Sequence, residues 1–389
     1  MIDVPSATRE AVYTNYRLQL PHREVLGTLV VRDGRIAAID AGITAHGIDG
    51  EGRYLMPGLV ELHTDNLERM LSPRPGIRWP ADAAALYHDA VVVSAGITTV
   101  FDAIAIGDIA DGAVAGGSPR VTHHRAMVDA IVRHRAARRF AADHEIHLRC
   151  ELVYEDLVPT VQGYVDRGEI AMLSLMDHTP GQRQFVDLRK FEQYYVGKHG
   201  VKPDELAAFV ERRKRDHRTT SPRNRAALVR LARERGLPLA SHDDATAEHV
   251  DEALRDGVRI AEFPTTELAA AAAHGAGLAV VVGAPNIVQG RSHSGNVSAL
   301  DLVRAGYADV YSSDYVPHSL LHAVFLTARE TGMPLHEAMR AATVTPARAA
   351  GLEDRGTLEV GMRADLVMVA SDDGMPRVAG VVVGGTRVG

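Results

Sequence analysis

The chain has 389 residues, of which 46% are hydrophobic and 24% are charged. This ordinary globular balance argues against wholesale disorder, and no run of sequence approaches the ~18 apolar residues that a membrane-spanning helix needs. The formal net charge of −7 argues against a general nucleic-acid binder. The N-terminal residues lack the charged-then-apolar order of a signal peptide, and the single cysteine, Cys150, excludes an intrachain disulfide. We therefore expect a protein of the reducing cytoplasm.

Lysine is unusually scarce in this sequence. Of the 43 basic residues, four are lysines and 39 (43 minus 4) are arginines. A GC-rich genome is the simplest explanation of the general bias. The positions of the four lysines are a separate question, and they are Lys190, Lys198, Lys202 and Lys214.

Both ends of the chain contain short strand-like segments separated by turns. They are residues 13–20, 29–32, 35–39, 365–369 and 378–383, with a hairpin turn expected at Asp33-Gly34. We predict that residues 1–56 and 356–389 together form one small β-sandwich domain.

The middle of the chain, residues 57–355, alternates strand-like and helix-like segments. The expected strands are residues 58–63, 97–103, 146–153, 170–178, 238–243, 258–263, 278–283 and 309–314, and the longest expected helices are 81–94, 121–142 and 204–235. Eight such alternations match a (β/α)8 TIM barrel, which usually needs ~250 residues plus insertions. A doubly wound open sheet also alternates, but it favours a glycine-rich phosphate loop after its first strand, and no such loop is present.

Potential metal ligands occur at the ends of five of these strands, where TIM barrels place their chemistry. Residues two apart on a strand point the same way, so His63 and Asp65 can grip one ion. Glu151 is expected to face the barrel interior, with a buried ion pair to Arg149 as the alternative. The six candidates for a mononuclear or binuclear divalent-metal site are His63, Asp65, Glu151, His178, His242 and Asp314. Asp243 and Asp244 are interpreted instead as caps of the following helix.

Several of these segments resemble the amidohydrolase superfamily. The resemblance rests on Pro57-Gly-Leu-Val-Glu-Leu-His63, on the late strand ending at Asp314, and on the segment from Gly356 to Asp365. Members usually carry His-x-His on the first strand, and many bridge two metals with a carboxylated lysine. This chain has Asp65 in place of the second histidine and no lysine before residue 190, so Glu151 is the natural substitute. The resemblance implies one or two divalent ions, with zinc expected and manganese or iron as alternatives.

A narrower resemblance covers nearly the whole barrel. It is carried by residues 63–69, 73–80, 96–102, 175–185, 241–246, 262–266, 283–286, 291–298 and 312–317. These segments resemble the α-D-ribose 1-methylphosphonate 5-triphosphate diphosphatases of the bacterial carbon–phosphorus lyase pathway for phosphonate use. The resemblance implies hydrolysis of the triphosphate to the 5-phosphate with release of pyrophosphate. Asp314 is the expected base that takes the proton from water, and His242 is the second expected catalytic residue.

A polyanionic substrate needs cationic and hydrogen-bonding groups in the loops after the strands. The candidates are Arg74, Arg78, Arg183, Lys190, Asn286, Arg291 and His293. For each of them, the alternative to substrate binding is a solvated surface charge or a helix cap. The insertion at residues 179–220 is interpreted as a lid over the substrate. Trp79, the single tryptophan, is expected to pack in the core, with a wall of the site as the alternative.

Two other functions fit the same pattern. One is an amidase or deaminase acting on a cyclic amide or purine, the commoner chemistry of the superfamily, although a neutral substrate would not need so many cationic loops. The other is a catalytically inactive binding member of a phosphonate-pathway complex. Homo-oligomerisation and contact with other proteins of that pathway are left open by the sequence, and no membrane or nucleic-acid partner is expected.

Overall fold

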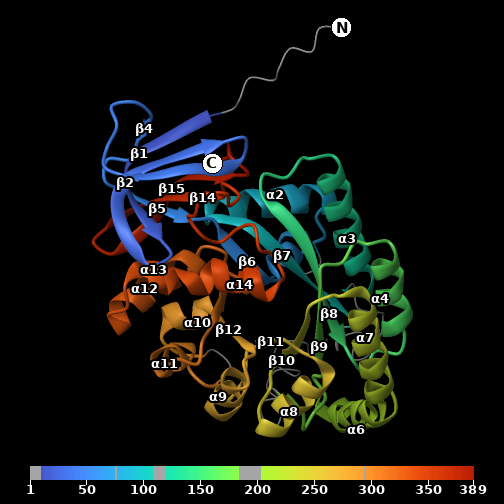
Figure 1. Cartoon of the computed structure of the whole chain (residues 1–389). Coiled ribbons are helices and arrows are strands. Elements are labelled where there is room, and N and C mark those ends of the chain that lie inside the picture. The colour runs from blue at the N-terminus through green and yellow to red at the C-terminus, as the bar shows by residue number, and fades with distance from the viewer. Residues whose placement is uncertain (1–9, 75–76, 108–119, 184–202, 293–294) are drawn as a thin grey trace, which may run out of the picture.

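The computed structural model describes residues 10–74, 77–107, 120–183, 203–292 and 295–389. A barrel of strands and helices fills most of the molecule, and a separate sheet built from both ends of the chain lies against it (Figure 1). Within the described ranges, no helix is long and apolar enough to cross a membrane.

The barrel consists of eight parallel strands, as predicted. They are β6 (Leu59–Thr64), β7 (Ile97–Ile106), β8 (Asp143–Glu151), β9 (Met172–Met176), β10 (Leu239–His242), β11 (Ile260–Glu262), β12 (Ala279–Gly283) and β13 (Val310–Ser312). They pair in chain order, and a parallel bridge between Thr64 and Asp314 joins the last strand to the first. The predicted (β/α)8 architecture is confirmed, whereas the division of the chain at residues 56 and 355 stays a prediction.

A buried glutamate fastens the seam between β6 and β13. Glu61 accepts hydrogen bonds from the Ser312 hydroxyl at 2.8 Å and from the Ser313 backbone N–H at 2.5 Å. The Thr64 hydroxyl donates to the carbonyl of Asp314 at 2.8 Å. A buried carboxylate needs such partners, and these three contacts fix the two strand ends side by side.

The helices lie mainly outside the barrel (Figure 1). Those of the first half are α1 (Asn66–Leu71), α2 (Ala81–Ser94), α3 (Arg120–Ala136), α4 (Leu157–Asp166), α6 (Pro203–Thr219) and α7 (Ser221–Arg235). Those of the second half are α8 (Ala247–Asp256), α9 (Glu267–Gly275), α10 (Ala284–Gln289), α11 (Ala299–Ala305), α12 (Ser319–Thr331), α13 (Leu335–Ala338), the 3-10 helix η3 (Met339–Ala342) and α14 (Val344–Ala349). The single helix expected over 204–235 is wrong: it is two helices. Pro222 lies in the first turn of α7. Proline has no N–H to donate, so it is tolerated in a first turn, where the N–H groups have no partner within the helix, but it breaks a helix in the interior.

The two ends of the chain form one mostly antiparallel sheet. Its strands are β1 (Glu10–Leu20), β2 (Arg23–Arg32), β3 (Arg35–Ala41), β4 (Ile48–Asp49), β5 (Tyr54–Pro57), β14 (Leu366–Asp372), β15 (Met375–Val383) and β16 (Thr386–Arg387). The order β16-β15-β14-β5-β1-β2-β3 places the C-terminal strands beside β5. Side chains from both halves of this sheet share one core, for example Leu29 of β2 and Val382 of β15. The sheet therefore buries apolar side chains from both ends of the chain in a core of its own.

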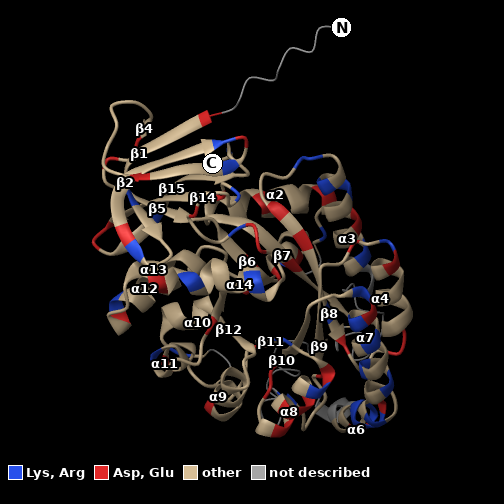
Figure 2. Ribbon diagram, viewed as in Figure 1, with Lys and Arg blue, Asp and Glu red and all other residues tan. Residues whose placement is uncertain are grey.

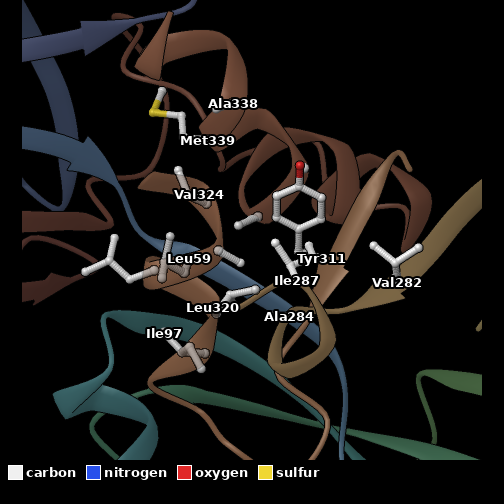
Figure 3. Packing of buried hydrophobic residues seen from close by; sticks show 14 of the residues in the cluster. Leu59, Ile97, Val282, Ala284, Ile287, Tyr311, Leu320, Val324, Ala338 and Met339 are labelled. Carbon is white, nitrogen blue, oxygen red and sulfur yellow. The ribbon is translucent and has the colours of Figure 1, made fainter. Parts of the chain in front are cut away.

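A shared core attaches this sheet to the barrel. Leu59 and Ile97 of the barrel strands pack in one buried cluster with Leu320 and Val324 of α12 (Figure 3), and Val367 of β14 belongs to the same cluster. Because the cluster contains residues from both bodies, burial of apolar surface holds the sheet and the barrel together.

Candidate metal centre

Polar side chains converge where the barrel strands end. His63 lies on β6, His178 follows β9, His242 ends β10 and Glu262 ends β11. Three strands leave the barrel through a residue with left-handed backbone: Asp243 (φ 56°), Phe263 (φ 52°) and Asp314 (φ 52°). Such conformations cost on the order of 1–3 kcal/mol for residues other than glycine and cluster at functional sites.

Glu262 holds two histidines in the same tautomer. Its two carboxylate oxygens lie 2.8 Å from Nδ1 of His63 and 3.1 Å from Nδ1 of His242. Burial would raise the pKa of Glu262, but His63 and His147 hold that pKa well below its ordinary value. Burial lowers the pKa of His63 to about 4. An ionised carboxylate only accepts, so both Nδ1 atoms donate, and each Nε2 keeps its lone pair for another partner.

Glu151 does the same for His178. Its Oε2 lies 2.7 Å from Nδ1 of His178, and its Oε1 accepts from the His178 backbone N–H at 3.2 Å. The prediction that Glu151 faces the interior is confirmed, and its partner is His178 rather than Arg149. Although burial opposes it, Glu151 and Asp243 raise the pKa of His178 to about 10. The surroundings of this imidazole therefore favour positive charge, as a cation site requires.

Asp243 lies near Nε2 of both His178 and His242. Its Oδ2 lies 3.7 Å from Nε2 of His178 and 3.6 Å from Nε2 of His242. These separations are too long for hydrogen bonds. Two atoms that each lie about 2.1 Å from one tetrahedral ion are about 3.4 Å apart, so the observed spacing suits ligands of a common ion. His178, His242 and Asp243 could thus hold a divalent metal.

In a second buried group of histidines and carboxylates, the distances are short enough for hydrogen bonds. Asp102 Oδ1 lies 2.7 Å from Nε2 of His88, and its Oδ2 lies 2.8 Å from Nδ1 of His144. Asp89 accepts from the backbone N–H of Ala142 at 2.9 Å and lies 3.3 Å from Nε2 of His144. Each oxygen of Asp102 has its own histidine at hydrogen-bond distance, so this group is a structural network between β7, β8 and α2.

Asp65 and Asp314 lie together at the barrel seam. The backbone N–H of Asp65 donates to the carbonyl of Asp314 at 3.1 Å. Burial, together with the Asp65 carboxylate, raises the pKa of Asp314 to about 7. Within the part of the chain that the structure describes, Oδ1 of Asp65 is buried without a hydrogen-bond partner, and so is Nε2 of His147. Buried acceptors of this kind fit a centre that receives a cation and water.

Arg183 is already committed to protein partners. Its guanidinium pairs with Asp244, donates to Glu252 at 3.0 Å and reaches the carbonyl of His242 at 3.3 Å, and 5% of the side chain is exposed. Arg183 therefore supports the end of β10. Lysine and arginine residues are numerous along α6, which belongs to the insertion at residues 179–220, and along α7, which follows it (Figure 2).

The other expected substrate-binding residues occupy different settings. Arg74, Arg78 and Arg291 are exposed, and Asn286 is partly buried on α10 just after β12. Lys190, His293 and residues 184–202 of the proposed lid lie outside the described residues, whereas the last part of the proposed lid forms α6. The expectation for Trp79 is wrong: 45% of its side chain is exposed, so it is not a core residue.

The sequence interpretation missed two residues of the candidate centre, Asp243 and Glu262. Asp243 and Asp244 do not cap the next helix, because α8 begins after Thr246, whose side chain accepts from the N–H of His249. Glu262 was not among the expected site residues. A glutamate that ends a strand of otherwise buried apolar residues was the available signal, since a charge there needs a buried partner.

Comparison with protein families supplies an independent view of this barrel. The model of the amidohydrolase family matches residues 54–388. The chain belongs to this family. The match covers all eight barrel strands and the strands of the C-terminal end.

A curated relative and two solved structures are also similar. Alpha-D-ribose 1-methylphosphonate 5-triphosphate diphosphatase of Escherichia coli (strain K12) is 42% identical over 381 residues, which are 97% of this chain and 100% of the relative. A 5-methylcytosine deaminase from Klebsiella pneumoniae has a TM-score of 0.63 at 16% identity, covering 97% of each chain. An N-acetylglucosamine-6-phosphate deacetylase from Pasteurella multocida has a TM-score of 0.61 at 13% identity, covering 98% of this chain and 100% of the other. The two structures share the fold.

Proposed function

We propose that this chain is a cytoplasmic, metal-dependent hydrolase that converts α-D-ribose 1-methylphosphonate 5-triphosphate to the 5-phosphate and pyrophosphate. The observation that carries the proposal is the 42% identity to the E. coli diphosphatase over the whole length of that relative. The barrel mouth supports it, because a metal-binding geometry lies beside a buried carboxylate suited to proton transfer.

His178, His242 and Asp243 are the proposed metal ligands. The set contains two imidazoles and one carboxylate, a combination typical of catalytic zinc, with manganese or iron as alternatives. Glu151 and Glu262 orient the imidazoles from behind, so the proposed role of Glu151 moves from ligand to orienting carboxylate. His63, Asp65 and Asp314 remain candidates for a second ion or for contacts to water.

A divalent ion held there would lower the pKa of a bound water and polarise a phosphoryl oxygen. Asp314 is the proposed base, and its carboxylate accepts the proton of the attacking water. A base with a pKa near the working pH is the most effective, and burial gives Asp314 a pKa of about 7. Arg74, Arg78 and Arg291 are the exposed cations proposed to meet the departing pyrophosphate, together with Lys190, Asn286 and His293.

The direct test offers the metal-loaded protein ribose 1-methylphosphonate 5-triphosphate, ATP and a cyclic amide in parallel. Products are followed by phosphorus NMR and by an ammonia assay. Pyrophosphate and the 5-phosphate are expected from the first compound, with far slower turnover of ATP. Orthophosphate as the first product, or ammonia from the cyclic amide with an inert triphosphate, would refute the proposal and favour the amidase or deaminase alternative.

A further inference from the structure

Among the residues that the structure describes, Arg149 is a partly buried arginine without a hydrogen-bond or ion-pair partner. It lies on β8 two residues before Glu151, and residues two apart on a strand share a face, so both side chains project into the barrel. Ile146, Leu148 and Cys150 point the other way, into the apolar cluster between the strands and their helices. The guanidinium therefore lies inside the barrel, on the same face as the group that holds His178.

No hydrogen bond or ion pair joins Arg149 to any residue in the ranges that the structure describes, and its Nε has neither solvent access nor a partner. Guanidinium groups carry five donors, and an enclosed charge normally has its donors satisfied. Arg183 shows the ordinary situation in this same barrel mouth, since both of its terminal nitrogens donate to protein acceptors: Asp244, Glu252 and the His242 carbonyl. The two arginines thus differ in what remains free for a ligand.

The charge of Arg149 is secured by neighbours at longer range. Burial by itself would lower its pKa, but Asp65, Glu68 and Asp314 outweigh that effect and raise it. These carboxylates keep the guanidinium charged without occupying its donors. An arginine held in this way is available for a planar, two-pronged contact with an anion.

We propose that Arg149 binds a phosphoryl group of the substrate at the metal centre, as a substrate-binding residue that faces the reacting end of the triphosphate. The proposal rests on the diphosphatase function proposed above for its choice of anion. Its location separates it from the exposed arginines of the loops: it lies near Asp65, Asp314 and Glu262, which are carboxylates at the candidate metal centre. A donor aimed at that position stabilises negative charge that develops during cleavage.

The test measures pyrophosphate binding by titration calorimetry, which requires no turnover. Arg149→Gln is compared with the wild type, with Arg149→Lys as the conservative variant and Arg183→Gln as the matched control. Metal content is measured on each protein recovered after the titration, and folding is checked by circular dichroism. We expect Arg149→Gln to retain its metal and to bind pyrophosphate at least about tenfold more weakly, because a hydrogen bond to a charged group is lost. Arg149→Lys should lose less pyrophosphate affinity, since lysine keeps the positive charge but lacks the planar pair of donors of the guanidinium group.

Arg183→Gln should lower the melting temperature, whereas the pyrophosphate affinity of its folded, metal-loaded form should change by less than about threefold. Unchanged pyrophosphate affinity in metal-loaded Arg149→Gln would overturn the proposal. Loss of metal and pyrophosphate together would also overturn it, because Arg149 would then act through the carboxylates. If Arg149→Gln does not fold, the comparison of Arg149→Lys with the wild type decides by the same criterion. The two proposals can fail separately. If pyrophosphate binding depends on Arg149 but the wild-type protein does not cleave the triphosphate, the proposed function is refuted and the inference about Arg149 stands.

Discussion

Oε2 of Glu151 lies 2.7 Å from Nδ1 of His178, and this contact decides which imidazole nitrogen faces the barrel mouth. Nε2 of His178 lies 3.7 Å from Oδ2 of Asp243, and the same oxygen lies 3.6 Å from Nε2 of His242. The same arrangement recurs between Glu262 and His242. Two buried glutamates thus orient the two histidines that we propose as ligands of one ion.

Replacing Asp243 should remove the ion while the barrel stays folded. Asp243→Asn loses the anionic ligand that both Nε2 atoms approach, so we expect metal affinity to fall by more than a hundredfold. Metal analysis after dialysis against a weak chelator measures this. Asp244→Asn is the matched control: it weakens the pairing with Arg183 and should lower thermal stability, yet hold its metal. Equal metal retention by the two variants would exclude Asp243 as a ligand.

Glu151 offers a graded test of orientation against direct ligation. Glu151→Gln retains an oxygen that can accept from Nδ1 of His178, and Glu151→Leu does not. An orienting role predicts a small loss of metal affinity for the glutamine variant and about 10- to 100-fold for the leucine variant. Competition with a fluorescent chelator provides the affinities. Complete loss of metal in Glu151→Gln would instead establish Glu151 as a ligand.

The role proposed for Asp314 predicts a fall in kcat with the fold intact. Asp314→Asn keeps the size of the side chain, and its backbone carbonyl still accepts from Thr64 and Asp65. Loss of a general base costs about 10²- to 10⁴-fold, so we expect kcat to decrease by that factor while KM changes much less. Steady-state kinetics and circular dichroism check both points, and near-normal turnover would remove Asp314 from the mechanism.

The buried network around Asp102 predicts a pH-dependent contribution to stability. Although burial opposes it, Asp102 raises the pKa of His144 to about 9, against about 6.5 in an unfolded chain. A raised pKa in the folded state stabilises the protein fully below pH 6.5, and that contribution is lost as the pH rises through 9. Relative to His144→Gln, the wild type should therefore lose about 3 kcal/mol of unfolding free energy across this window, at about 1.4 kcal/mol per pKa unit.

Urea denaturation at pH 6, 7.5 and 9 measures this difference. His274→Gln is the control, because His274 pairs with Asp309 at an exposed position where solvent screens the charges. A constant difference between the wild type and His144→Gln across the three pH values would show that His144 does not carry the charge.

Sequence alone determined the architecture and the types of residue at the mouth of the barrel. The alternation of apolar strands with amphipathic segments is local information, and it predicted all eight barrel strands, with ends that differ by a few residues. His63, His178, His242, Glu151 and Asp314 were likewise identified, because parallel strands bring their carboxyl ends to one face.

Only the tertiary structure decided which of these groups touch. Glu262 and His63 are 199 residues apart in sequence, and no local pattern indicates that they share a hydrogen bond. Asp243 was mistaken for a helix cap because its left-handed backbone, which turns it toward the histidines, depends on how β10 leaves the barrel. In the same way, two arginines that look alike in sequence differ in the folded chain: Arg183 pairs with Asp244 and Glu252, whereas Arg149 has no hydrogen-bond partner among the described residues. Hydrogen-bond partners are set by positions in space, and the closed barrel brings together residues that the chain keeps far apart.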